Sequence, residues 1–271
     1  MARRLPVWYL PHGGGPWNVL SDTGDEVGYK ALASWLSKFG AVVEASGATS
    51  ILVISAHWEE PRPTIHFGER PGMLYDYGGF PEHSYHIKWP APGDPRLAAR
   101  VEELLAAAGI KTARELERGY DHGTFVPLMV AFPEPRLPVA QLSLIRGLDP
   151  VAHYEVGRAL EPLRDEGVLI VGSGMSYHNL RAFFSGDDSV GPISAAFDDW
   201  LERSVALADP QERRGALVNW MTAPHALECH PRSEHLLPLH VIAGAAGKDP
   251  GQAAYRGMLM GARISAIGFG T

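Results

Sequence analysis

The chain has 271 residues, of which 45% are hydrophobic and 20% are charged, and this composition predicts one sizeable core in a single domain over residues 1–271. The formal net charge of −7 excludes a basic surface of the kind that binds nucleic acid or anionic lipid. The single cysteine, Cys229, excludes an intrachain disulfide framework and a cysteine-rich metal site, and it favours a reducing cytoplasm.

No segment contains the ~20 consecutive apolar residues that a membrane-spanning helix needs. The N-terminal stretch Met1–Pro6 carries basic residues, but Pro11 and the glycines after it interrupt the apolar run that follows. The sequence therefore lacks the apolar core of a signal peptide. We expect a cytoplasmic protein with no membrane partner.

Short apolar runs of strand length alternate with amphipathic stretches of helix length, a pattern typical of α/β proteins. Continuous apolar runs predict strands that are buried on both faces. The predicted strands are Pro6–Leu10, Ser50–Ser55, Thr64–Phe67, Pro138–Leu144, Val168–Val171 and Arg263–Phe269. The predicted helices are Glu26–Lys38, Asp94–Ala108, Pro150–Arg164, Gly191–Ala206, Gln211–Trp220 and Glu234–Ala245.

Local signals support these boundaries. Asp94 and Asp149 each precede a proline and are natural N-caps, and Gly109 ends the helix that Asp94 begins. The stretch Glu69–Gly93 is rich in glycine, proline and aromatic residues, and a loop of this length in a compact domain is usually functional or a lid. We expect one domain with a mostly buried mixed sheet, helices on both faces, and a metal site at the carboxyl ends of the strands.

Histidine is unusually frequent, with 12 residues, and three predicted strands run directly into one. The first leads to His12, the second through Ala56 to His57, and Val168–Val171 leads through a glycine-rich turn to His178. Ligands of open α/β sheets bind beyond the carboxyl ends of the strands. Three histidines at such ends therefore predict a common site.

Two further candidates are His122, in a loop-like Tyr-Asp-His-Gly string, and His235, which follows Glu234 at the start of an apolar segment. The histidines of the C-terminal region recur every five residues, which rotates each by ~140° on a helix, so they cannot share one face. At most one or two of His225, His230, His235 and His240 belong to a site. We expect His66, His83, His86 and His153 to be structural.

A metal site would explain why several histidines are expected to meet at the ends of the strands. Neutral imidazoles bind Fe(II), Zn or Mn, and three protein ligands on one side of iron leave positions for a substrate and for O₂. A catechol chelates through both oxygens, and a further histidine with a pKa near neutrality suits the proton transfers that such a reaction needs.

The sequence lacks the complete motifs of esterases, dinucleotide-binding proteins and P-loop proteins. His12 and the three glycines after it reproduce the HGGG string of esterases, but the nucleophile elbow G-x-S-x-G is absent because His178 stands where its last glycine is required. The glycines before His178 lack the third glycine of a dinucleotide fingerprint, and no P-loop string occurs.

Seven strings in one order resemble the class III extradiol ring-cleavage dioxygenases, a LigB-like family, of the DOPA 4,5-dioxygenase type. They are PHGGGP (11–16), SAHWE (55–59), YDYGGFP (75–81), WPAPGDP (89–95), RGYDHGTFVPL (118–128), GSGMSYHNL (172–180) and HPRSEHLLPL (230–239). The resemblance covers most of the chain.

The resemblance implies that His12 and His57 bind the metal, with His235 as the third ligand. It implies that His178 is either the general base or a fourth ligand. It implies that His122 is a second acid/base, or that it hydrogen-bonds the substrate or the bound oxygen. Relatives of this family commonly use two histidines and a carboxylate, so Glu234 is an alternative to His235. Fe(II) is needed for activity, and zinc, which is not redox-active, is a plausible bound metal.

The implied reaction inserts O₂ into a catecholic ring, DOPA or another catechol, and opens it to a yellow muconic semialdehyde. We expect Tyr75, Trp58 and Tyr120 to contribute to substrate binding. Arg118, Lys88 and Arg181 are alternative partners for a substrate carboxylate. The competing hypothesis is a zinc-binding protein on the same fold that serves a binding role. The aromatic content is compatible with a homodimer.

Overall fold

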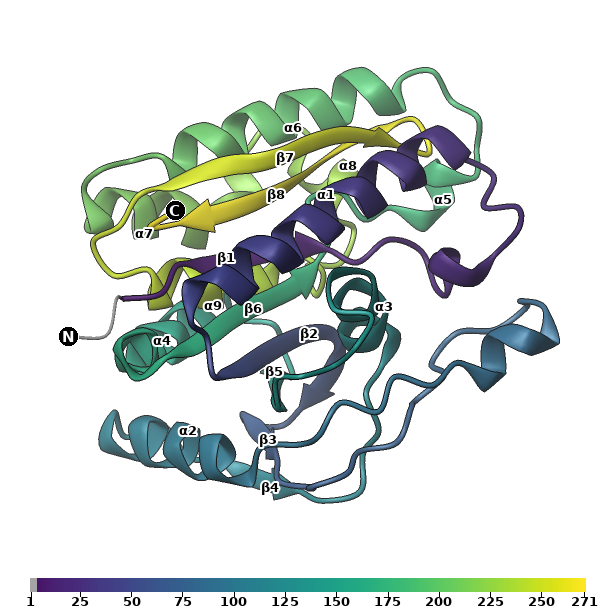
Figure 1. The fold of residues 1–271 in the computed structure, drawn as a ribbon. Helices are drawn as coiled ribbons and strands as arrows, with labels where there is room; N and C mark the ends of the chain where they lie inside the picture. The colour runs from purple at the N-terminus through teal and green to yellow at the C-terminus, as the bar shows by residue number, and fades with distance from the viewer. Residues whose placement is uncertain (1–3) are drawn as a thin grey trace.

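The buried apolar runs of the chain pair at the centre of one eight-stranded sheet, in the order β4-β3-β5-β2-β6-β1-β8-β7 (Figure 1). The computed structural model describes residues 4–271. Parallel pairing joins β1 to β6, β6 to β2, β2 to β5 and β3 to β4, whereas β8 pairs antiparallel with β1 and β7. The strands are β1 (Val7–Pro11), β2 (Ser50–Glu60), β3 (Thr64–His66), β4 (Ala113–Glu115), β5 (Val139–Ile145), β6 (Val168–Gly174), β7 (Gly251–Leu259) and β8 (Ala262–Phe269).

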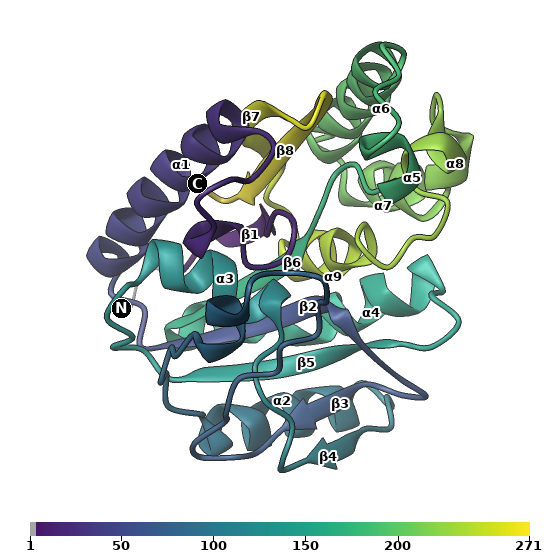
Figure 2. The same cartoon turned by 90° about the vertical axis from the view of Figure 1, so that its right-hand side faces the viewer.

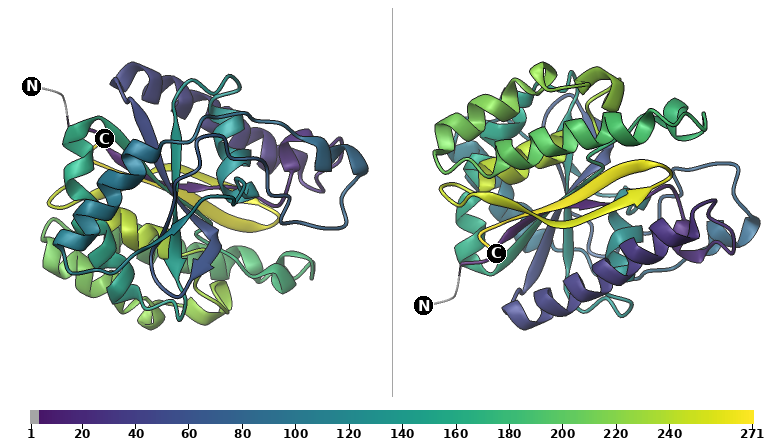
Figure 3. Two further views of the ribbon diagram at one scale, coloured as in Figure 1. Left: turned by 90° about the horizontal axis from the view of Figure 1, so that it is seen from below. Right: turned by 90° about the horizontal axis from the view of Figure 1, so that it is seen from above.

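Helices cover both faces of the sheet. Figure 2 shows α1 and α3 on one face and α4, α9, α6 and α7 on the other, and Figure 3 shows α1 and α6 on opposite sides of the β7–β8 hairpin. The α-helices are α1 (Glu26–Ser46), α2 (Pro95–Ala107), α3 (His122–Ala131), α4 (Pro150–Leu160), α5 (Leu180–Phe183), α6 (Val190–Val205), α7 (Pro210–Val218), α8 (Ala226–Cys229) and α9 (Leu237–Ala245). The 3₁₀ helices are η1 (Trp17–Val19), η2 (Glu82–His86), η3 (Glu161–Glu166) and η4 (Trp220–Thr222).

The predicted α/β fold with a mixed, buried sheet is confirmed. The sequence did not predict α3, because this helix is apolar on nearly all sides and contains Pro127, so no amphipathic period marks it. It also missed the short strand β4 and the edge strand β7, whose side chains are mostly exposed or half-buried. The last predicted helix began too early: α9 starts at Leu237, after Glu234 and His235.

Among the described residues, no helix is long and apolar enough to cross a membrane. The sequence predicts that the N-terminal region lacks the apolar core of a signal peptide. Residues 1–3 of this region lie outside the described residues.

Both predicted aspartate caps are confirmed, and they should contribute unequally to stability. Asp94 is buried, caps α2 through the backbone N–H of Leu97, and accepts a 2.7 Å hydrogen bond from the Ser50 hydroxyl of β2. Asp149 is exposed and caps only α4, through Val151. Asp94→Ala should lower the free energy of unfolding by about 2 kcal/mol, since it removes a cap and a buried hydrogen bond.

The matched variant Asp149→Ala should cost about 1 kcal/mol or less. Urea unfolding followed by circular dichroism measures both. Equal losses would show that the link between Asp94 and Ser50 contributes nothing.

Candidate metal centre

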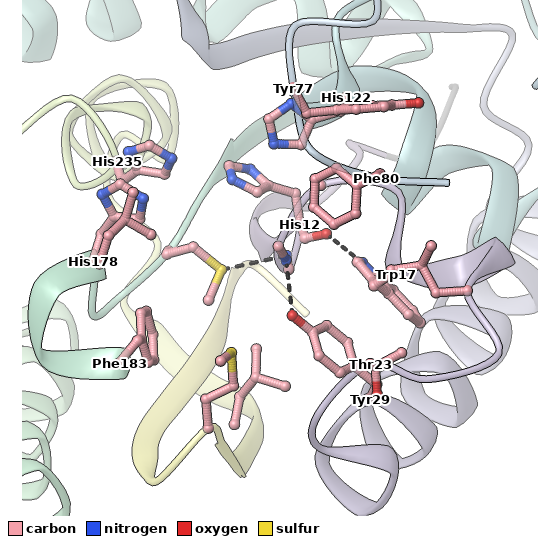
Figure 4. A pocket seen from close by; sticks show the side chains of 18 of the residues that line it. His12, Trp17, Thr23, Tyr29, Tyr77, Phe80, His122, His178, Phe183 and His235 are labelled. Atoms are coloured by element: carbon pink, nitrogen blue, oxygen red, sulfur yellow. Dashed lines mark hydrogen bonds between the residues drawn. The ribbon is translucent and has the colours of Figure 1, made fainter. Parts of the chain in front are cut away.

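Three imidazoles converge at the carboxyl ends of the central strands. His12 directly follows β1, His57 lies in β2, and His235 lies just before α9. The Nε2 atom of His57 is 3.2 Å from Nε2 of His12 and 3.2 Å from Nε2 of His235. One ligand atom from each of these residues lies within 4.8 Å of the others, a spacing that suits a metal ion. Figure 4 shows the cavity onto which these rings face.

The order β2-β6-β1 explains how residues so distant in sequence meet. These three strands are neighbours and parallel, so their carboxyl ends reach the same edge of the sheet. The pairing of β2 with β5 shifts register between Ile54 and Glu59. Bulges of this kind redirect side chains near functional sites, and His57 lies within the shifted segment.

The backbone of His235 packs directly against the end of β6. Its carbonyl accepts hydrogen bonds from the Tyr9 hydroxyl (2.6 Å) and from the backbone N–H of Met175 (3.1 Å). A Cβ atom at Gly174 would lie 2.1 Å from the same carbonyl oxygen. Gly174 therefore allows the backbone of His235 to pack closely against β6. This packing, rather than the binding of a nucleotide phosphate, explains the glycine.

The second nitrogen of each converging ring has a polar partner. His12 Nδ1 lies 3.1 Å from Ser173 Oγ, whose hydroxyl donates to the Gly123 carbonyl and can therefore accept from the ring. His57 Nδ1 lies 3.3 Å from Asp76 Oδ2, and His235 Nδ1 lies 2.9 Å from Glu234 Oε1. Partners of this kind fix the tautomer of a metal-binding histidine and direct its other nitrogen at the metal.

Burial keeps these three imidazoles neutral. Desolvation, followed by repulsion from the neighbouring imidazoles, holds the pKa of His12 and of His57 well below the usual value. Burial is also the main cause that lowers the pKa of His235, to about 4. Neutral rings carry the lone pairs that coordinate a cation.

Glu234, the alternative third ligand, faces away from this convergence. Its Oε1 atom contacts Nδ1 of His235 and lies 3.4 Å from Nδ1 of His178, and its Oε2 atom lies 3.2 Å from Arg232. Burial opposes ionisation, but hydrogen bonds from His178 and His235 outweigh it and lower the pKa of Glu234 well below its usual value. The carboxylate thus contacts the Nδ1 side of both imidazoles, and one ligand atom each of His178, Glu234 and His235 also lies within 4.8 Å of the others, so these residues form a second group that could hold a metal ion.

The two predicted acid/base histidines line the same cavity. The ring of His178 stacks on that of His235 with centroids 3.3 Å apart, beside the three-histidine group rather than in it. His122 is not in a loop, as the sequence suggested, but is the first residue of α3, and its ring centroid lies 3.9 Å from that of His57.

Sequence reasoning missed Asp76. Its Oδ1 atom accepts from the backbone N–H of His122 at 2.9 Å and lies 2.8 Å from Nδ1 of the same residue, while Oδ2 faces His57. Burial raises the pKa of this carboxyl, but the hydrogen bonds from His122 outweigh it, so the pKa is below its usual value. The only signal was its place in the YDYGGFP string.

The cavity has a volume of about 470 Å³ and lies in front of the histidines, within the size range of small-molecule sites. Tyr77 and Phe80, from the long loop that we predicted to be functional, line it. The imidazoles of His122, His178 and His235 lie on one side in Figure 4, and Trp17, Thr23 and Tyr29 lie on the other.

Trp58, Tyr75 and Tyr120, the three aromatic residues predicted to bind substrate, do not line this cavity. The Tyr75 hydroxyl donates to the Ile87 carbonyl, and the Tyr120 hydroxyl is buried against the Val139 carbonyl. Trp58 is buried under the Arg118 guanidinium. These three side chains therefore pack outside the cavity and support the segments that form its walls.

The remaining histidines of residues 4–271, which include the four predicted to be structural (His66, His83, His86 and His153), do not line this cavity. His153 accepts from the Ile145 N–H, and His230 and His240 face the carbonyls of Ser176 and Leu217. His225 is exposed and pairs with Glu228.

Comparison with known proteins agrees with this arrangement. Residues 7–266 match the family model described as the catalytic LigB subunit of aromatic ring-opening dioxygenase. A 4,5-DOPA dioxygenase extradiol of Beta vulgaris is 40% identical over 90% of this chain and 87% of its own, and one of Portulaca grandiflora is 45% identical over 76% of each. The crystal structure of an uncharacterized protein of Escherichia coli K12 superposes with a TM-score of 0.79 at 32% identity, covering 98% of this chain and all of the other.

Proposed function

The chain belongs to the family of the catalytic LigB subunit of aromatic ring-opening dioxygenases, and on this premise we propose that it cleaves catechols at a ferrous ion held by His12, His57 and His235. The observation that carries the proposal is the convergence of three Nε2 atoms, each on a ring whose Nδ1 has a polar partner. The enzyme class, an extradiol ring-opening dioxygenase, follows from the relatives.

The donor set fits a divalent transition metal. Three neutral nitrogen ligands on one side, facing a cavity, leave positions open for exogenous ligands. Bound Fe(II) would supply a redox centre that holds the catechol oxygens and O₂ together. The net reaction adds both atoms of O₂ to the ring carbons at the broken C–C bond, next to the hydroxyl pair.

The protein itself would manage the protons. His178 lines the cavity beside His235 and would accept the proton of a catechol hydroxyl, with its Nδ1 held by Glu234. His122 lines the cavity beside His57, with its Nδ1 held by Asp76, and would hydrogen-bond the substrate or return a proton to the oxygen released on ring opening. Two acid/base groups in one cavity favour this enzyme function over a zinc-binding role.

Metal removal tests the proposal. Chelation followed by anaerobic loading with Fe(II) should restore O₂ uptake with 4-methylcatechol, whereas Zn(II) at equal occupancy should not, because zinc has no redox chemistry. Metal analysis confirms occupancy in both samples. Equal activity with zinc would contradict the proposed role of iron.

Asp76→Asn should lower kcat/KM by about 10- to 100-fold while the metal is retained, because an amide cannot accept hydrogen bonds from Nδ1 of both His57 and His122 as the two carboxylate oxygens do. Steady-state kinetics and metal content measure the two effects. Asp187→Asn, an exposed aspartate outside the metal centre, is the matched control. An unchanged kcat/KM for the Asp76 variant would show that Asp76 does not contribute to catalysis.

We propose further that the whole chain works as one catalytic domain. Its proposed metal ligands lie directly after β1, in β2 and just before α9, so a segment that contains all of them spans at least residues 12–235.

A further inference from the structure

The cavity has two chemically different ends. The histidines form one end, where the two oxygens of a catechol would bind under the proposed function. The rest of the wall is largely apolar, and a substituent that extends from the ring would lie against it. This wall includes Trp17, Leu20, Phe183, Phe184, Leu259 and Met260.

No lysine or arginine among residues 4–271 lines the cavity. The three cations that the sequence offered for a substrate carboxylate lie elsewhere. Arg118 is committed to Asp121 and to the His57 carbonyl, and Lys88 and Arg181 are exposed. Arg232, behind the histidines, is paired with Glu59 and Glu234.

The acidic side chain that lines the cavity lies at its histidine end. Asp76 places a carboxylate in that wall, against Nδ1 of His57 and Nδ1 of His122. A substrate carboxylate at the apolar end would lose its hydration without gaining a cation. Burying an unpaired charge is strongly unfavourable.

The glycine-rich turn after His12 does not make up for the missing cation. An HGGG turn can bind an anion through its backbone N–H groups, but two of them are already used here. Gly13 donates to Met175 Sδ at 3.4 Å, and Gly14 donates to the Tyr29 hydroxyl at 3.1 Å. Gly13 also has a φ of +79°, and a Cβ there would lie 2.4 Å from the indole nitrogen of Trp17, so the glycine serves packing of the wall.

From these observations, and resting on the proposed function, we propose that the enzyme prefers catechols whose ring substituent is uncharged and apolar, and that it discriminates against catechols bearing a carboxylate. The apolar wall binds the substituent, and the lack of a cation excludes the acid.

Two matched pairs of substrates test the inference with the iron-loaded enzyme. The first is 4-propylcatechol against 3-(3,4-dihydroxyphenyl)propionate, and the second is 4-ethylcatechol against 3,4-dihydroxyphenylacetate. In each pair the molecule without the carboxylate should have a kcat/KM at least about tenfold higher, because only the acid must bury an unpaired charge. A kcat/KM equal or higher for the acids in both pairs would overturn the inference.

A variant at the mouth of the cavity tests its cause. Leu180 lines the cavity and is 56% exposed, so a longer polar side chain is tolerated there. Leu180→Arg supplies a cation, and Leu180→Gln is the uncharged control. The preference for 4-propylcatechol over the propionate should fall in the arginine variant and persist in the glutamine variant. An equal fall in both variants would show that charge is not the discriminator.

The two proposals fail differently. If no catechol is cleaved although iron is bound, the proposed function fails and the substrate inference fails with it. If acids are cleaved at least as well as neutral catechols, only the substrate inference fails.

Discussion

Replacing His235 with alanine should abolish both metal retention and ring cleavage. The side chain provides one of three nitrogens that converge within 4.8 Å, and two ligands rarely hold a divalent ion in a functional geometry. We expect kcat to fall by about three orders of magnitude or more. The measurements are metal content after anaerobic loading with Fe(II) and O₂ uptake with 4-methylcatechol.

Glu234→Gln is the matched control, and it decides between the two candidates for the third ligand. Glutamine keeps an acceptor oxygen for Nδ1 of His235 and His178 but removes the charge. Metal should be retained, and kcat/KM should fall by about 10- to 100-fold, as is typical when a residue that orients a ligand is changed. Loss of metal in the glutamine variant, with retention in His235→Ala, would make the carboxylate the ligand.

Replacing His178 with alanine should lower kcat by about 10²- to 10⁴-fold, the usual contribution of a general acid or base, and should leave most of the metal in place. The ring stacks on His235 and lines the cavity, but it lies outside the three-histidine group. Steady-state kinetics and metal analysis of the same preparation measure the two effects. Added imidazole should restore part of the lost turnover.

His225→Ala provides the control for this experiment, because His225 is exposed, pairs with Glu228 and lies outside the cavity. It should leave both kcat and metal content unchanged. If His178→Ala loses metal and turnover in equal proportion, His178 is a ligand first and the division of roles proposed above is wrong.

The position of the site was predictable from simple rules. Buried apolar runs gave the central strands, and the rule that ligands bind at strand carboxyl ends singled out His12, His57 and His178. No such rule reached His235, which precedes a helix. Its local sequence made it a candidate, and only the resemblance to a family predicted that it binds the metal together with His12 and His57.

The walls of the cavity were less predictable, and the reason is physical. Side chains alternate regularly along a strand, so Trp58 lies buried on the far side of β2 from its neighbour His57. The loop after Phe67 has no such period. Its Tyr75 turns to a backbone carbonyl, whereas Asp76 and Tyr77 face the site. Tertiary packing alone sets these directions.

The central claim, extradiol cleavage at iron, is tested most directly by the fate of O₂. The enzyme is loaded with Fe(II) without air and mixed with 4-methylcatechol under isotopically labelled O₂, and the product is analysed by absorbance and mass spectrometry. The account predicts a yellow, ring-opened product that contains both labelled oxygen atoms. An unlabelled quinone, or no O₂ uptake with iron confirmed bound, would contradict it.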